Sequence, residues 1–403
     1  MSRLASDRID TLPRMGDLAL HHPRGLLFTA FEPSGDQLAA PVIARLRAMR
    51  PDLPIHAIGG PRMAAAGATL IESTGEHAVM LLGALSHAME HRRRVKRLAG
   101  WLAANPIVGH VPVDSPAANW AICNLVRSMQ PQAKITHLVT PQIWAWGGWR
   151  IKKLRRLTDH VLCILPFEPA WLKERGVTGT FVGHPLYTDL AATIHDAPKI
   201  DLPPGSPRLA LLPGSRPSEH RRNWPTMLAA YEELAKKHAG LTGIVAAVDD
   251  AAMQRLRTIE PRAWPASLHV KVGAVDDVLR WCDTALVVSG TATLHTAVFE
   301  KPMVVLYNVS RLTWNLLGRL LVSTRTFSLP NLIAQSQGNG RIVPEFVPHF
   351  GAVAPVADAV GALLSDAELR TEQVRDLRVV GDAFRGLRFA EQAAQVIVRT
   401  TGI

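Results

Sequence analysis

The sequence predicts an α/β protein made of two doubly wound domains, each with a mainly parallel sheet. Strand-like runs alternate with helical patterns, and several runs are apolar without polar alternation, which is typical of strands buried on both faces. A stretch rich in proline and glycine at 187–207 separates two such alternating series and indicates an interdomain connection. We therefore expect a ligand in a cleft between the domains, at the carboxyl ends of the strands.

Composition and charge narrow the class of protein. The 403 residues are 47% hydrophobic and 20% charged, which favours two or more folded domains over global disorder. Residues 1–24 read as a loose leader without the apolar core of a secretory signal, and no run is long enough for a transmembrane helix. The net charge of +11 is compatible with nucleic acid, an anionic membrane or anionic substrates. Three widely spaced cysteines are expected to be buried, reduced thiols, as in a cytosolic protein: Cys123, Cys163 and Cys282.

The first alternating series defines an expected N-terminal domain over 25–190. Its strands are expected at 25–30, 55–58, 107–113, 134–139 and 160–165, with a last strand closed by the Gly-His-Pro turn at 183–185. Its helices are expected at 37–49, 76–104, 117–129 and 149–157.

The second series follows an expected linker at 191–207 and defines a C-terminal domain over 208–375. Its strands are expected at 209–212, 243–248, 268–272, 284–288 and 303–307, and its helices at 217–238, 250–258, 275–281 and 291–300. The tail from 356 to 400 has helical spacing, and 376–403 is expected to form a final helix.

Two turns after strands in the second half indicate a pyrophosphate site. In the first, Gly214 permits a sharp turn, Ser215 offers a hydroxyl and Arg216 offers a planar fork for phosphate oxygens. The second combines small residues, three hydroxyls and a helix N-terminus at Ser289, Gly290, Thr291, Ala292 and Thr293. The alternatives are a solvated turn and an ordinary helix cap.

Acidic residues at strand ends in the first half are candidates for chemistry. Asp114 could act as a general base if a dry cleft raised its pKa, or it could only cap the next helix. Glu32 and Asp36 flank a turn after the first strand. An aromatic segment at 141–146 could line a ligand site or form core packing, and His184 could be structural or catalytic.

An apolar stretch at 78–89 runs into five cations, Arg92, Arg93, Arg94, Lys96 and Arg97, and a second basic run occupies 150–156. Apolar residues beside clustered cations suit an anionic membrane interface. A solvated helix face is the alternative.

Together these segments resemble the lipid-A-disaccharide synthases, which are inverting glycosyltransferases of the GT-B fold. The similarity spans about residues 25–350 and rests on eleven motifs in order. They are EPSGD (32–36), IGGPRM (58–63), VDSP (113–116), PQIWAW (141–146), PFEPAWLKERGV (166–177), FVGHPL (181–186), LLPGSR (211–216), SGTATL (289–294), KPMVV (301–305), SLPNLIA (328–334) and IVPEF (342–346).

The resemblance implies transfer of 2,3-diacylglucosamine from UDP-2,3-diacylglucosamine to 2,3-diacylglucosamine 1-phosphate. It implies a cytoplasmic enzyme peripheral to the inner membrane, with no metal or other cofactor, and a C-terminal helix that packs back on the N-terminal domain. Asp114 becomes the candidate base, Arg216 and residues 289–293 would hold the pyrophosphate, and Asn331 and Glu345 would line the donor side. The residues on the acceptor side would be Glu32, Ser34, Asp36, Gln142, Trp144 and His184. The residues that contact the membrane would be Leu81, Leu82, Leu85 and the five cations at 92–97.

The chain departs from the family pattern at four positions. Phe31 and Pro33 replace a glycine and an alanine, Ala117 replaces a second acidic residue after Asp114, and His295 stands where a glutamate usually follows SGTATL. In GT-B enzymes that glutamate tends to hold the nucleotide ribose, so this position bears on nucleotide binding.

Two other functions remain open. One is a different UDP-sugar enzyme of the same architecture, such as a soluble glycosyltransferase or an epimerase, which would not need the apolar stretch at 78–89. The other is a catalytically silent module that binds lipid headgroups or nucleotides. Nucleic acid is not expected as a partner, because no RNA-binding motif is present. A homo-oligomer is compatible with the sequence.

Overall fold

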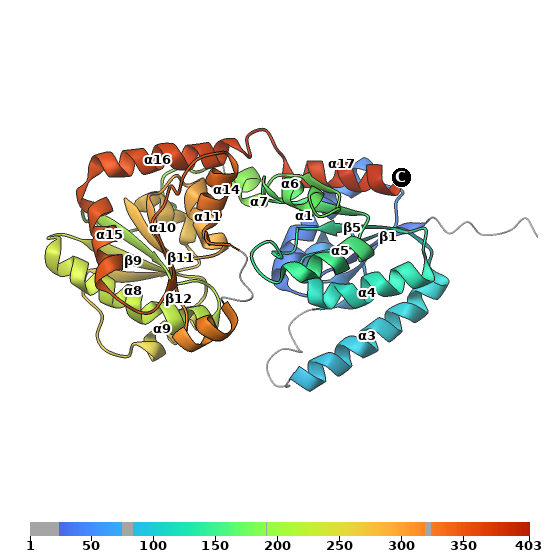
Figure 1. The fold of residues 1–403 in the computed structure, drawn as a ribbon, viewed down its shortest axis with the longest axis horizontal. Helices are drawn as coiled ribbons and strands as arrows, with labels where there is room; N and C mark the ends of the chain where they lie inside the picture. The colour runs from blue at the N-terminus through green and yellow to red at the C-terminus, as the bar shows by residue number, and fades with distance from the viewer. Residues whose placement is uncertain (1–23, 75–83, 191, 319–323) are drawn as a thin grey trace, which may run out of the picture.

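The computed structural model describes residues 24–74, 84–190, 192–318 and 324–403, and it contains two parallel sheets that lie side by side (Figure 1). The first sheet has the strand order β3-β2-β1-β4-β5-β6-β7. Its strands are β1 (Gly25–Thr29), β2 (Ile55–Gly59), β3 (Thr69–Ser73), β4 (Ile107–Pro112), β5 (Lys134–Leu138), β6 (His160–Cys163) and β7 (Gly179–Phe181). Since helices cover both faces of the sheet, the apolar run of β1 is fully buried.

The helices of this half are α1 (Pro33–Met49), α2 (Pro61–Ala65), α3 (Ala84–Ala104), α4 (Pro116–Met129), the short η1 (Gly148–Arg150), α5 (Ile151–Leu157), α6 (Glu168–Lys173) and α7 (Pro185–Leu190). The strand order reverses between β1 and β4, which are paired neighbours. The segments that follow these two strands therefore flank the crevice where ligands of doubly wound sheets bind. These segments contain Glu32 and Asp114.

The second sheet repeats this design with the order β10-β9-β8-β11-β12-β13. Its strands are β8 (Arg208–Leu212), β9 (Thr242–Ala247), β10 (Leu268–Val272), β11 (Thr284–Val288), β12 (Met303–Asn308) and β13 (Glu345–His349). Its helices are α8 (Pro217–Lys237), α9 (Asp250–Ile259), α10 (Val275–Trp281), α11 (Thr291–Val298), α12 (Arg311–Thr313), η2 (Trp314–Gly318), α14 (Leu329–Ser336), α15 (Ala354–Ser365) and α16 (Ala367–Asp382). The order reverses between β8 and β11, so the loops that carry Arg216 and Gly290 share the crevice of this sheet.

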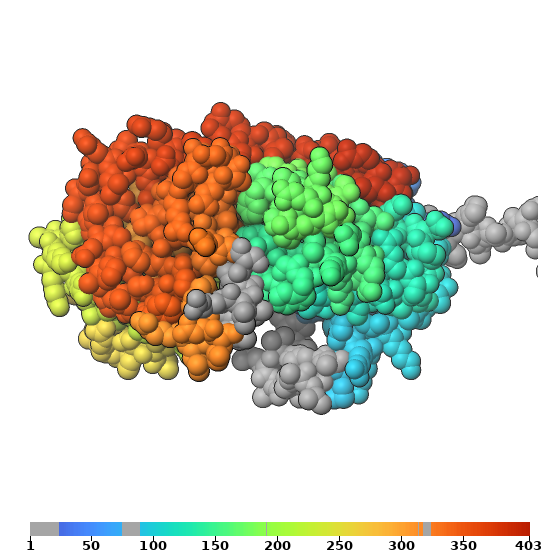
Figure 2. Space-filling model, in the orientation of Figure 1, coloured from blue at the N-terminus to red at the C-terminus, as the bar shows by residue number. Residues whose placement is uncertain are grey.

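The last helix, α17 (Phe389–Thr401), returns to the first half and packs against α1 and β5, as the resemblance implied. Its apolar side chains Phe389, Ala393 and Ile397 join the core that contains Phe28 of β1. In the space-filling view the C-terminal segment runs across both halves of the molecule (Figure 2). The two halves are thus joined at the linker and again at the C-terminal crossing.

Most expected elements are present, and three strands differ from the expectation. β3 and β13 were not predicted, because their residues are mostly half-exposed and lack a continuous apolar run. β7 is short and ends at Phe181, two residues before the Gly-His-Pro turn that was expected to close it. Of the leader expected at 1–24, residues 1–23 lie outside the described residues, and of the helix expected at 76–104 only the part from Ala84 is described. The single final helix expected at 376–403 was wrong, because α16 ends at Asp382 and α17 begins at Phe389.

The linker follows the surface of the C-terminal sheet domain. The Lys199 backbone N–H donates to Asp277 (2.9 Å), and the Trp281 indole N–H donates to the Pro203 carbonyl oxygen (3.0 Å). All three cysteines are free and buried, as expected. Burial raises the pKa of Cys123 and Cys282 to about 12, which leaves both as unreactive thiols.

Candidate active site

Asp114 lies directly after β4 in a tight turn of unusual backbone geometry. Asp114 and Ser115 both adopt left-handed conformations, with φ of 42° and 34°. The turn is fixed by Asn119, whose Nδ2 donates to the carbonyl oxygens of Val113 (3.1 Å) and Asp114 (3.0 Å). Thr29 at the end of β1 donates in turn to Asn119 Oδ1 (2.6 Å). Such strain persists only where surrounding contacts enforce it and is often found at functional sites.

Charges from both domains act on the Asp114 carboxyl. Burial raises its pKa above the ordinary value and the negative charge of Glu32 raises it further, while a backbone N–H of Ser115 and the Arg216 guanidinium lower it. Glu32 itself is exposed and accepts a hydrogen bond from the Ser115 hydroxyl (3.0 Å). Asp114 is therefore a half-buried carboxyl, and Arg216, the cation that lowers its pKa, belongs to the opposite domain.

The loop after β8 presents Arg216 to solvent, and Glu219 holds the loop in shape. The Ser215 and Arg216 backbone N–H groups both donate to Glu219 Oε2 (3.1 Å each). Gly214 has a φ of 95°, and a side chain there would collide with Glu219. The Arg216 side chain is 75% exposed and pairs with Glu219 at 3.1 Å. Because these amides are already occupied, the loop offers a phosphate the guanidinium and the Ser215 hydroxyl.

The loop after β11 offers fewer hydroxyls than expected. Ser289 donates to the Phe327 carbonyl oxygen (3.0 Å), and Thr293 donates to that of Gly290 (2.8 Å). Thr291 is exposed, and its hydroxyl has no hydrogen bond within the described part of the chain. Two of the three hydroxyls expected at the pyrophosphate site therefore already donate to backbone carbonyls. Thr291 and the first amides of α11 remain available to an anion.

These two loops line one cleft of about 720 Å³ together with residues of the N-terminal domain. Gln37 and Arg62 reach it from the N-terminal side, and Arg216, Thr291 and His295 from the C-terminal side. Arg62 and Arg216 bring a cation from each domain to this cleft, which suits an anionic ligand.

Arg62 was not among the candidate residues, although it lies in the IGGPRM motif. The buried carboxylate of Asp36 accepts hydrogen bonds from the backbone N–H groups of Gly60 (3.1 Å), Arg62 (3.1 Å) and Met63 (2.9 Å). Asp36 therefore fixes the turn that carries Arg62. Its carboxylate is already hydrogen-bonded, so it is not free for the acceptor contact that was expected of it.

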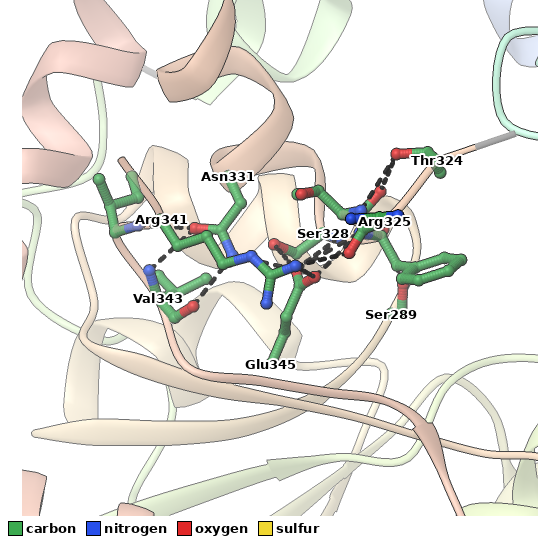
Figure 3. A network of polar contacts seen from close by, with 11 residues as sticks. Ser289, Thr324, Arg325, Ser328, Asn331, Arg341, Val343 and Glu345 are labelled. Carbon is green, nitrogen blue, oxygen red and sulfur yellow. Dashed lines mark hydrogen bonds and ion pairs between the residues drawn. The ribbon is translucent and has the colours of Figure 1, made fainter. Parts of the chain in front are cut away.

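Asn331 and Glu345 lie inside a polar network rather than on the cleft wall (Figure 3). Glu345 is 1% exposed and accepts from the Ser328 N–H (3.1 Å), the Ser328 hydroxyl (2.9 Å) and Asn331 Nδ2 (3.0 Å). The same segment includes Phe327, whose carbonyl oxygen accepts the Ser289 hydroxyl. The structure therefore gives Asn331 and Glu345 a positioning role behind the Ser289 loop instead of a direct donor contact.

The other residues expected on the acceptor side differ in their exposure to solvent. Ser34 and Gln142 are exposed, whereas Trp144 is buried with its indole N–H donating to the buried carboxylate of Glu168 (3.0 Å). His184 is also buried, and burial together with the charge of His295 lowers its pKa to about 4. Trp144 and His184 thus serve packing and domain contact.

Three of the five cations expected at a membrane are paired with acids, and two of these pairs are close. Arg94 pairs with Glu72 (2.7 Å), and Arg97 pairs with Glu72 and Glu90 (2.9 Å each). Arg92, Arg93 and Lys96 are exposed, and of these only Arg93 has a carboxylate within reach, Glu90 at 4.0 Å. Leu81 and Leu82 lie outside the described residues, and Leu85 lies in the first turn of α3.

Among the described residues no group of three or more acidic, histidine or cysteine side chains is arranged to hold a metal ion. None of the described helices has the length and apolarity needed to cross a bilayer.

Two doubly wound domains, with a strand-end carboxyl in one and two small-residue loops in the other, define a GT-B type of nucleotide-sugar enzyme. Solved structures share this fold. The chain is similar to a putative UDP-N-acetylglucosamine 2-epimerase from Listeria monocytogenes (12% identity, TM-score 0.61, covering 93% of this chain and 95% of that one). It is also similar to the glycotransferase of kitacinnamycin (14% identity, TM-score 0.61, covering 94% and 99%). At these identities the likeness concerns the fold alone.

Sequence comparison identifies the family. Residues 26–396 match the family described as lipid-A-disaccharide synthetase. The chain is 35% identical to the lipid-A-disaccharide synthase of Paraburkholderia phymatum, covering 87% of this chain and 90% of that protein. It is also 35% identical to that of Burkholderia pseudomallei, covering 93% and 97%. The chain belongs to the lipid-A-disaccharide synthase family and is a glycosyltransferase of lipid A biosynthesis.

Proposed function

We propose that this chain moves 2,3-diacylglucosamine from UDP-2,3-diacylglucosamine to the 6-hydroxyl of 2,3-diacylglucosamine 1-phosphate. The product is the β-1,6-linked tetraacyl disaccharide 1-phosphate, and UDP is released. Family membership over residues 26–396 and the anion-suited cleft support this reaction.

The donor pyrophosphate binds between Arg216 and the start of α11. As the bond from the sugar C1 to UDP breaks, negative charge grows on the pyrophosphate, and the Arg216 guanidinium and the free amides of α11 stabilise it. The acceptor oxygen attacks C1 from the opposite face, so the configuration inverts. Asp114 takes the proton of that hydroxyl, and its raised pKa makes it a stronger base than an exposed aspartate.

The observation that carries this proposal is the cleft that Arg216 and Thr291 of the C-terminal domain line together with Gln37 and Arg62 of the N-terminal domain. Asp114 follows β4 at the crevice of the N-terminal sheet, and the charge of Arg216 lowers its pKa from the opposite domain. The test is incubation with both substrates and mass detection of a tetraacyl disaccharide 1-phosphate. A protein that binds UDP, does not form this disaccharide and transfers the sugar to another acceptor would support the alternative, a UDP-sugar enzyme with a different acceptor.

The enzyme works in the cytoplasm as a peripheral protein of the inner membrane, because both substrates carry acyl chains that do not leave a bilayer readily. The exposed cations Arg92, Arg93 and Lys96 on α3, next to the exposed Met89, support this placement.

A further inference from the structure

The segment that follows β12 exposes apolar side chains that the reaction described above does not use. Leu312 of α12 is 69% exposed and Leu316 of η2 is 60% exposed, and no large apolar side chain in the described ranges is more exposed than Leu312. Phe350, directly after β13, is 40% exposed, and the Arg311 guanidinium lies over its ring, 4.6 Å from the ring centre. Exposed apolar residues that are grouped in this way mark interaction sites. We call Arg311, Leu312, Leu316 and Phe350 the donor-domain patch.

The donor-domain patch lies at the same edge of the sheet as the proposed pyrophosphate site. Asn308 at the end of β12 pairs with His349 at the end of β13, so the segments that follow these two strands are neighbours. The loops that carry Arg216 and Thr291 follow β8 and β11 of the same parallel sheet. Since the carboxyl ends of parallel strands meet at one edge, the patch and both loops share that edge.

A half-buried tryptophan joins the donor-domain patch to the pyrophosphate site. Trp314, between Leu312 and Leu316, packs edge to face on Phe327, with 6.2 Å between the ring centres. The Phe327 carbonyl oxygen accepts the Ser289 hydroxyl (3.0 Å). The segment is therefore fixed on its inner side, next to the Ser289 loop, while Leu312 and Leu316 remain in solvent.

The charge of this part of the chain suits an anionic surface. Residues 301–344 contain Lys301 and four arginines but no aspartate or glutamate. Of these arginines, Arg311, Arg325 and Arg341 are exposed. Cations beside exposed apolar side chains suit the headgroup region of an anionic bilayer. Two copies of the chain joined through this patch would bring like charges together, which disfavours a second copy as its occupant.

Figure 1 shows where the donor-domain patch lies relative to α3, the helix with the exposed cations. The orange segment after β12 and the helix α3 both lie at the lower edge of the molecule in this view, one in each domain, whereas α16 lies at the upper edge. The space-filling view has the same orientation and shows both segments at that lower edge (Figure 2). A single bilayer surface at this edge can therefore contact both domains.

We propose that the donor-domain patch is a second membrane contact, so that both domains rest on one anionic bilayer. The inference rests on the proposed function, because only a donor with acyl chains needs its own domain at the headgroups. Leu312, Leu316 and Phe350 enter the boundary between headgroups and acyl chains, and Arg311 stays at the level of the lipid phosphates. The pyrophosphate site at the same sheet edge then receives a donor whose acyl chains remain in the bilayer.

A fluorescent label tests this contact directly. Leu312→Cys can be labelled selectively, because the three native cysteines are buried. An environment-sensitive dye at residue 312 should shift to the blue on vesicles of phosphatidylglycerol and phosphatidylcholine, and the shift should fade as salt rises. Leu369→Cys, on α16 at the upper edge, is the matched control and should not shift.

A double variant tests whether the contact serves the reaction. Leu312→Ser with Leu316→Ser should weaken vesicle binding by about 10-fold or more, because each leucine loses its apolar contact with lipid. It should lower turnover of donor in vesicles by a similar factor and leave kcat in detergent unchanged. Leu369→Ser with Val379→Ser removes two exposed apolar side chains from α16 and should change neither. Equal loss of turnover in vesicles and detergent would show that the two leucines support the fold, and would overturn the inference.

The label also separates this inference from the proposed function. A dye at residue 312 that does not respond to vesicles, while one at Arg93→Cys on α3 does, would show that the N-terminal domain alone contacts the membrane. A dye at residue 312 that is already blue-shifted without vesicles would show that another segment or a second copy covers the patch. Either result overturns the inference and leaves the proposed function standing. A parent that forms no disaccharide in detergent would overturn the proposed function, whatever the dye reports.

Discussion

Asn119 holds the backbone of Asp114 in place through a hydrogen bond from its Nδ2 to the Asp114 carbonyl oxygen (3.0 Å). Asn119 is itself fully buried and fixed by Thr29 of the neighbouring strand. The position of the candidate base therefore depends on a side chain that is buried behind the turn. Since Asp114 and Ser115 both have positive φ, the turn would relax without this support.

Asn119→Ala should lower kcat by about 10- to 100-fold, because a small displacement of a catalytic group is costly. It should also lower the free energy of unfolding by about 1–3 kcal/mol through the backbone carbonyls left without a partner. Steady-state kinetics and denaturant unfolding measure the two effects. Asn105→Ala, which removes a similar bond to the Trp101 carbonyl oxygen far from the site, should leave kcat unchanged. A parent-like kcat for Asn119→Ala would make the asparagine purely structural.

The pH dependence of kcat/KM should reflect the pKa of Asp114 and the effect of the neighbouring Glu32 on that pKa. A base must be deprotonated, so kcat/KM falls as the pH drops through the Asp114 pKa, which lies above the ordinary value. Glu32→Gln removes a negative charge that raises this pKa, so the acid limb should move to lower pH. Glu174→Gln, a remote exposed carboxyl, should leave the limb in place. A limb that stays fixed in Glu32→Gln would mean that another group controls it.

Glu168 should make stability depend on pH. Burial raises its pKa to about 7, although the Trp144 indole and the Ile164 and Leu165 amides all donate to it. A folded pKa above the unfolded value gives stability that is present at low pH and lost as the pH rises toward about 7. The penalty of Glu168→Gln should therefore be larger at about pH 5 than at about pH 7.5. A penalty that stays the same over this range would show that Glu168 is ionised throughout it and is held by its three donors.

Membrane binding should depend on where the cations lie and not on net charge alone. Replacing Arg92, Arg93 and Lys96 by glutamine should weaken binding to anionic vesicles strongly, since each cation near such a surface contributes about 1 kcal/mol. Replacing Lys236, Lys237 and Arg375 by glutamine changes the net charge equally, on exposed positions of the C-terminal domain. Vesicle co-sedimentation at low salt compares the two triple variants. If both triple variants lose vesicle binding equally, the membrane contact does not lie on α3.

The sequence predicts the strands that are buried on both faces, such as β1, β8 and β11, because they are mostly apolar. It does not predict β3 and β13, which are edge strands of mixed residues, although the edge strand β10 has the expected bounds. The same limit applies to the site. Strand ends locate Asp114 and Arg216, because chain position alone brings them to the crevice.

What the sequence does not show is which polar groups are already occupied. Asp36, Glu219 and Glu345 are carboxylates near the cleft, yet each is used by backbone amides. The partners of Asp36 and Glu345 lie up to 27 residues away, so no local pattern shows that these carboxylates are taken. Arg62 reaches the cleft for the converse reason, because the tertiary fold brings it beside residues that are distant in sequence.

The most direct test of the account is to measure turnover and UDP affinity of Asp114→Asn on one preparation. Loss of the base should lower kcat by about 10²- to 10⁴-fold. UDP affinity should stay within a few-fold of the parent, because Arg216 and α11 still hold the pyrophosphate. Turnover close to that of the parent would contradict the assignment and leave Asp114 as a structural residue of the turn before α4.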